Sequence, residues 1–160
     1  MKLRKWLLVA GCCLGLIAPA LGRDVAEIAK QVDKTDNGGQ ILALAQEIAG
    51  QIGKDGAGLT VDQFVVAADT FGKLVARARD KTKERAIFEQ FAKLGGGLQD
   101  SCRAKIRGLE AQTGDNEAAL EALYRSDAWH NINYAAAAFN YWRAWALLAV
   151  AQTYPPSHRE

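Results

Sequence analysis

The chain has 160 residues, of which 49% are hydrophobic, so it is long enough for one domain with a core of its own. The formal charge of +2 falls to −1 when the three positive charges of Lys2, Arg4 and Lys5 leave with residues 1–22. Nucleic-acid binders carry a strongly basic face, so a nucleic-acid partner is not expected for a chain this close to neutral.

Residues 1–22 have the pattern of a cleaved secretory signal peptide. Positive charges precede an apolar run from Trp6 to Ile17, and small residues follow up to Ala20 and Gly22. Cleavage after either small residue satisfies the small-x-small pattern of signal-peptide cleavage sites. Cleavage after Gly22 leaves a charged residue at the start of the mature chain. The sequence therefore predicts a periplasmic or secreted protein.

A lipoprotein is the alternative, because residues 9–12 resemble a bacterial lipobox that would leave Cys12 lipidated. The apolar run before Cys12 is short for a signal sequence and the residues after it are also apolar, so ordinary cleavage is favoured. The mature chain then keeps Cys102 alone, which excludes an internal disulfide. Cys102 lies on an apolar helical stripe, which favours packing over an intermolecular disulfide.

Residues 23–154 are predicted to form an all-α fold, which is a single-domain array of about six or seven helices. Residues 155–160 are predicted to be a polar tail. Apolar residues recur every three or four positions, which is the helical period, and no segment alternates as a strand does. Thr60 and Gln63 have the spacing of a capping box at a helix start. Whether residues 60–94 form one helix or two stays open.

Glycines and acidic residues predict the boundaries of the later helices. The run Gly95–Gly97 is expected to end a helix, because glycine is entropically costly inside one. Asp115 is expected to cap a short helix with a buried edge, and Asp127 to cap a long final helix. The expected buried edge of the short helix consists of Leu120, Leu123 and Tyr124.

The final helix, about 26 residues from Ala128 to Thr153, would extend roughly 39 Å, enough to cross a bilayer. Asn133, Asn140 and Arg143 interrupt it, and an arginine near mid-bilayer costs about 2.5 to 3.5 kcal/mol. No membrane span is therefore predicted in the mature chain.

Both faces of this final helix are apolar, so it is predicted to be largely buried and central. The first face consists of Tyr134, Ala138, Tyr141, Trp145 and Leu148, and the second of Ala135, Phe139, Trp142, Ala146 and Ala149.

Aromatic residues are unusually concentrated in this helix, and aromatics with arginine are what binding hot spots prefer. Core packing is the simpler interpretation for each single ring, yet eight aromatics between Tyr124 and Tyr154 exceed what a small core usually places on one element. The candidate binding residues for a partner or ligand are Trp129, Tyr134, Tyr141, Trp142, Arg143 and Trp145.

No motif indicates catalysis, a metal or a cofactor. His130 and His158 are the only histidines, and no phosphate-binding loop, haem-attachment or zinc-protease motif is present. The loop that begins at Asp33 resembles an EF-hand but has Leu44 where the twelfth position requires glutamate. No catalytic residue, metal ligand or cofactor is assigned.

The leading hypothesis is an exported, non-catalytic helical protein of the bacterial cell envelope that binds another envelope or secreted protein. An inhibitor, immunity factor, secretion accessory or adaptor would each fit, and a homo-oligomer stays open. The alternative is a periplasmic carrier of a small apolar or aromatic ligand held by Tyr134, Tyr141 and Trp145. A third hypothesis is a cell-wall hydrolase with a single catalytic glutamate, although no particular glutamate is indicated.

Overall fold

The computed structural model describes residues 24–56 and 58–155, and this part of the chain forms an array of six α-helices and one 3₁₀ helix without any strand. The predicted all-α class and the number of helices are confirmed. The elements are α1 (Val25–Ala29), η1 (Val32–Lys34), α2 (Gly38–Asp55), α3 (Val61–Lys81), α4 (Arg85–Thr113), α5 (Glu117–Tyr124) and α6 (Asp127–Gln152). The expected signal peptide lies outside the described residues, as does the tail beyond residue 155.

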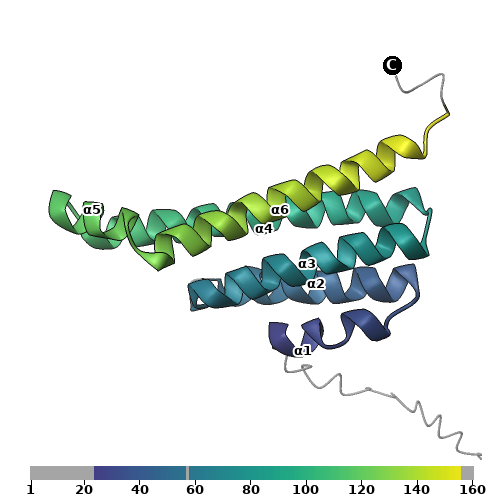
Figure 1. Cartoon of the computed structure of the whole chain (residues 1–160), viewed down its shortest axis with the longest axis horizontal. Helices are drawn as coiled ribbons and strands as arrows, with labels where there is room; N and C mark the ends of the chain where they lie inside the picture. The colour runs from purple at the N-terminus through teal and green to yellow at the C-terminus, as the bar shows by residue number, and fades with distance from the viewer. Residues whose placement is uncertain (1–23, 57, 156–160) are drawn as a thin grey trace, which may run out of the picture.

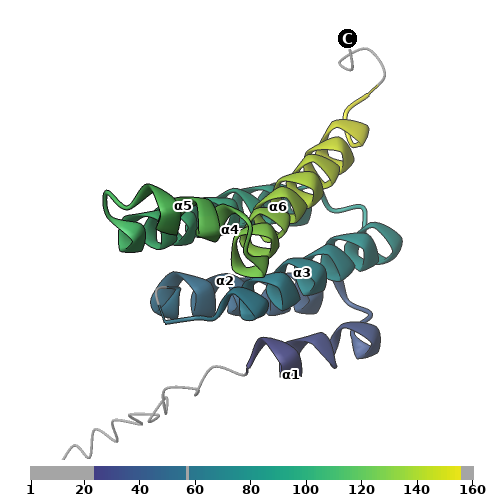
Figure 2. The ribbon, with the colours of Figure 1, turned by 60° about the vertical axis from the view of Figure 1, so that its left-hand side comes forward.

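The four long helices lie roughly along the long axis of the molecule (Figure 1). Helix α6 packs on α3 and α4, and α2 packs on the same two helices. Helices α1 and α6 lie at opposite sides of the array, and α5 lies at one end (Figures 1 and 2). Within the described ranges, no helix has both the length and the apolar character that a membrane span requires.

Side-chain caps place the helix starts close to the predicted positions. The Thr60 and Gln63 capping box is confirmed at the start of α3. The predicted caps of the last two helices are wrong by one residue, because Asn116 caps α5 and Ser126 caps α6. In each case the side-chain oxygen accepts from the backbone N–H three residues on, at 3.0 Å in α5 and 3.2 Å in α6. The expected caps, Asp115 and Asp127, stand one position too early and one too late for this bond.

Residues 60–94 form two helices rather than one. Helix α3 ends at Lys81, and Thr82 adopts an extended conformation with φ −142° and ψ 159° before α4 begins at Arg85. This reversal lets α4 run back along α2 and α3 (Figure 1).

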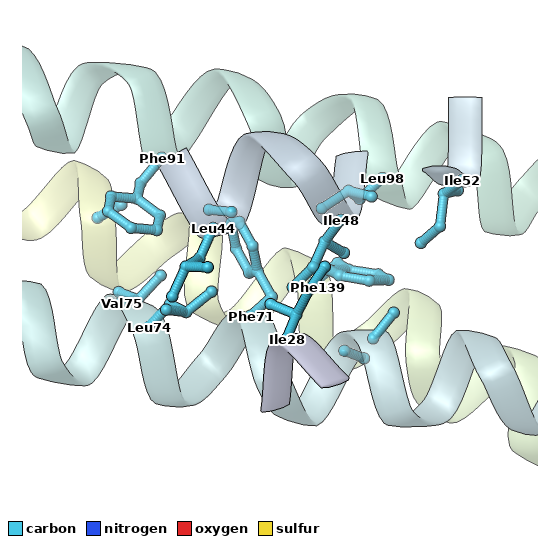
Figure 3. Packing of buried hydrophobic residues seen from close by; sticks show 14 of the residues in the cluster. Ile28, Leu44, Ile48, Ile52, Phe71, Leu74, Val75, Phe91, Leu98 and Phe139 are labelled. Carbon is cyan, nitrogen blue, oxygen red and sulfur yellow. The ribbon is translucent and has the colours of Figure 1, made fainter. Parts of the chain in front are cut away.

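One hydrophobic core joins the long helices. Phe71 of α3 packs edge-on against Phe91 of α4 and Phe139 of α6, with 5.7 Å between ring centroids in both pairs. Such edge-to-face pairs stabilise a core beyond the area they bury. Figure 3 shows the three rings among aliphatic side chains of the surrounding helices, including Ile48 of α2.

The predicted helix end at Gly95–Gly97 is wrong, because α4 continues through all three glycines. Gly95 is buried where α6 crosses α4, and a Cβ there would lie 3.1 Å from Cβ of Arg143 and 3.4 Å from the carbonyl oxygen of Phe139. The absence of a side chain lets the two backbones approach closely, and the packing gained offsets the entropy that glycine loses in a helix. A Cβ at Gly97 would meet no atom within 4 Å.

Helix α6 is buried on one side, so the prediction of a largely buried final helix is confirmed only in part. Ile132, Ala135, Phe139, Ala146 and Ala149 lie in the core. The opposite side faces away from α3 and α4, which cover only one face of α6.

The predicted buried edge of α5 is also wrong. Leu120 and Leu123 are half-buried and Tyr124 is 40% exposed, so no residue of α5 is buried. The short helix covers the ends of α4 and α6 without entering the core.

Gly95→Val and Gly97→Val form a matched pair that tests the close approach of α4 and α6. We expect Gly95→Val to lower the free energy of unfolding by about 1 to 3 kcal/mol, because the new side chain overpacks the crossing. Gly97→Val should leave stability unchanged or raise it by a few tenths of a kcal/mol through better helix propensity. Urea unfolding followed by circular dichroism measures both, and equal losses would contradict the packing role of Gly95.

Cys102 is fully buried, and burial raises the pKa of its thiol to about 12. The thiolate is the reactive form, so we expect Cys102 in the native chain to react with a thiol reagent at least about 100-fold more slowly than in the urea-unfolded chain. Equal rates in the two states would favour a thiol available for an intermolecular disulfide.

Candidate functional site

The outer face of α6 is the exposed surface that the sequence analysis only partly anticipated. We define it by six exposed residues, Tyr134, Ala137, Tyr141, Ala144, Leu148 and Ala151. The three large side chains remain 52%, 54% and 45% exposed, respectively, and Leu147 flanks them at 49%. This face lies opposite the buried residues of the same helix.

The outer face carries no formal charge. Between residues 131 and 154 the only charged side chain is Arg143, which lies on a different side of the helix. Surfaces of helices in water usually carry charged and polar residues on the side away from the core. An apolar face without charge is therefore a candidate interaction surface.

Tyr134 is held against α3 by a hydrogen bond. Its hydroxyl donates to Oδ1 of Asp69 at 2.8 Å. This bond, and then the negative charge of the carboxylate, raise the pKa of Tyr134 above its ordinary value. The ring is thus fixed at one end while about half of its surface faces water.

Three further candidate rings form a continuous cluster. Tyr141 contacts Trp142 and Trp145 edge-on, at 5.0 Å and 6.2 Å between ring centroids. Trp142 lies against the backbone of α3, where a Cβ on Gly72 would overlap the indole ring. The guanidinium of Arg79 lies over the ring of Trp145 at 4.2 Å. Tyr141 is exposed, whereas both tryptophans are half-buried.

The other two candidate residues lie apart from this cluster. Trp129 stacks on Tyr124 of α5 at 4.6 Å, and it precedes Tyr141 by 12 residues, or about 18 Å along the helix. Arg143 is exposed, and its side chain extends along Gly95 and Gly96 of α4. The structure therefore brings together four of the six candidates on one side of α6.

Open grooves lie elsewhere in the array. One of about 810 Å³ lies at the ends of α3 and α6, where Arg79, Asp80 and Lys83 are among its lining residues. Another, of about 450 Å³, lies between α2 and α4, and one of about 530 Å³ lies beside η1 and α2. Tyr134, Tyr141 and Trp145 line none of these three grooves. In residues 24–56 and 58–155, no three His, Cys, Asp or Glu side chains are grouped as metal ligands would be.

Sequence reasoning missed the alanines of the outer face and the residues of α3 that support the rings. Ala137, Ala144 and Ala151 repeat at intervals of seven, which was a usable signal. Asp69 and Arg79 are 65 and 66 positions from their ring partners, and no local pattern indicates such contacts.

Comparison of the chain with protein-family models, with curated proteins and with solved structures found no match. Functional interpretation therefore depends on the chain's own residues.

Asp69→Asn tests the bond that holds Tyr134. Because the carboxylate stabilises the neutral phenol, the substitution should lower the pKa of Tyr134 toward that of a free tyrosine. The stabilisation from this bond is present below the pKa of an unfolded tyrosine and is lost as pH rises through the raised folded value. An NMR titration of labelled tyrosines measures the pKa, with Tyr141 as the internal control. An unchanged Tyr134 pKa would contradict the contact.

Proposed function

We propose that this chain is an exported, non-catalytic protein of the bacterial cell envelope that binds another protein through the outer face of α6. The observation that carries this proposal is the exposed row of Tyr134, Tyr141 and Leu148 on a face without charge. Export is supported by the signal-peptide pattern of residues 1–22.

Preorganisation of the rings supports a binding role for this face. Tyr134 is tied to Asp69, and Tyr141 packs against two tryptophans that α3 holds in place. Side chains that are already ordered lose little conformational entropy when a partner covers them. Exposed tyrosines on a rigid helix are also typical anchors of protein interfaces.

The carrier hypothesis has less support. A carrier would need a cavity among Tyr134, Tyr141 and Trp145, whereas these rings pack on one another or on α3. The groove of about 810 Å³ has charged side chains at its edge, which suits an apolar ligand poorly. Native mass spectrometry of the purified protein tests the alternative, because a small molecule of defined mass would favour the carrier.

Photocrosslinking in the producing cell tests the binding face. A photoreactive phenylalanine analogue replaces Tyr141 in one strain and Gln46, an exposed residue of α2, in the control strain. We expect discrete protein adducts from position 141 that are absent from position 46, because only the outer face of α6 is covered by a partner. Identical adduct patterns, or no adduct at position 141, would contradict the proposed function.

A further inference from the structure

We propose that the partner for the outer face of α6 is a second copy of this chain, paired as two antiparallel helices around a two-fold axis between residues 142 and 143. The inference rests on the binding face of the proposed function and names its partner. Four observations carry it: the spacing of the face, the alternation of large and small residues, the absence of charge and the area exposed.

The six residues of the outer face have the spacing of a coiled-coil seam. From Tyr134 to Ala151 the intervals are three, four, three, four and three residues. Two helices that repeat apolar residues in this way can pack along a common seam by knobs-into-holes contacts. The core of the array does not use this seam, because it lies on the exposed side of α6.

Large and small residues alternate along the seam, and this order is complementary to that of a second, antiparallel copy of the same helix. Tyrosine or leucine occupies the first seam position of each heptad, and alanine the second. In an antiparallel pair, first positions face second positions of the partner helix. Tyr134 then faces the partner's Ala151, Tyr141 faces the partner's Ala144, and Leu148 faces the partner's Ala137.

Every large side chain therefore meets an alanine, and all three contacts share one centre between residues 142 and 143. A two-fold axis at that centre generates the same contacts in both directions, as an isologous interface requires. A parallel pair would instead place Tyr134 against the partner's Tyr134 and alanine against alanine. Layers of two large side chains that alternate with layers of two alanines pack less densely than layers that each pair a large side chain with an alanine.

The charge distribution also favours a second copy. No charged residue stands on the seam, so two copies meet without like-charge repulsion. Arg143 extends toward Gly95 and Gly96 of α4, away from the seam. A partner with a charged helix surface would have to bury those charges without counterions on this face, which is strongly unfavourable.

The exposed area is sufficient for a reversible dimer. A tyrosine buries about 200 Å² when fully covered, so Tyr134 and Tyr141, each about half exposed, leave roughly 400 Å² in water across two protomers. Stable interfaces bury at least about 1,200 Å² in total. The overlap from residue 134 to 151 extends about 27 Å, and Leu147, Leu148 and the alanines along it add to the exposed area. An interface at or below this size is typical of a weak, reversible dimer.

Light scattering on the protein expressed as the full chain with its own leader tests the pairing. The measured mass should rise from that of a monomer to that of a dimer as the concentration increases about a hundredfold. Ala144→Lys places two positive charges beside the two-fold axis and should weaken dimerisation by at least about tenfold. The matched control is Ala43→Lys on the exposed side of α2, which should dimerise as the unaltered chain does.

Disulfide crosslinking between two differently tagged chains tests the antiparallel register independently of those variants. We expect Ala137→Cys in one chain to crosslink rapidly with Leu148→Cys in the other. Mixtures with the same substitution in both chains should not crosslink, because the two cysteines would be offset by 11 residues, about 16 Å, beyond the reach of a disulfide. A chain without an added cysteine is the control for Cys102.

The outcomes separate this inference from the proposed function. Crosslinks between position 137 and position 148, with loss of the dimer in Ala144→Lys alone, are the expected result. Crosslinks between two copies of position 137 would overturn the antiparallel pairing. A monomer at all concentrations that still forms adducts with another protein through position 141 would overturn the dimer and leave the binding function intact. A monomer without such adducts would overturn both.

Discussion

Two glycines determine how closely α6 approaches its neighbours. At Gly72 the indole of Trp142 lies directly on the backbone of α3, and at Gly95 the backbone of α6 lies on that of α4. A side chain at either position would push α6 outward and separate Phe139 from Phe71, whose edge-to-face contact joins the two helices. Because interiors are close-packed, a shift of one helix affects the whole core.

The depth and rotation of α6 in turn define the surface proposed to bind a partner. With Phe139 and its neighbours turned inward, Tyr134, Tyr141 and Leu148 necessarily face water on the other side of the helix. Asp69 and Arg79 of α3 then support the ring of Tyr134 and that of Trp145. The core contacts and the candidate site therefore depend on the same orientation of α6, and a change that rotates this helix would alter both. A coherent seam at heptad spacing follows from the same rotation.

The helical period allowed the all-α class to be predicted from the sequence, because amphipathic stripes such as Ile41 to Ile52 depend on local order alone. Helix caps were predictable to within one residue, since several polar side chains near a helix start can accept the same backbone N–H. The continuity of α4 through Gly95 was not predictable, because the local cost of glycine is visible in the sequence and the α6 backbone that offsets it is not. The exposed face of α6 was anticipated only in part for a related reason: both faces are apolar, and only the positions of α3 and α4 determine which one is buried.

Hydroxyl-radical footprinting, with the protein diluted far enough to dissociate the proposed dimer, tests the orientation of α6 most directly. Phe139 and Tyr141 are two residues apart in sequence, yet the first is fully buried and the second more than half exposed. If α6 lies as described, Tyr141 and Leu148 are oxidised rapidly while Phe139 is protected until the chain unfolds. Equal protection of Phe139 and Tyr141 at high dilution would show that α6 is buried on both sides and would contradict the account.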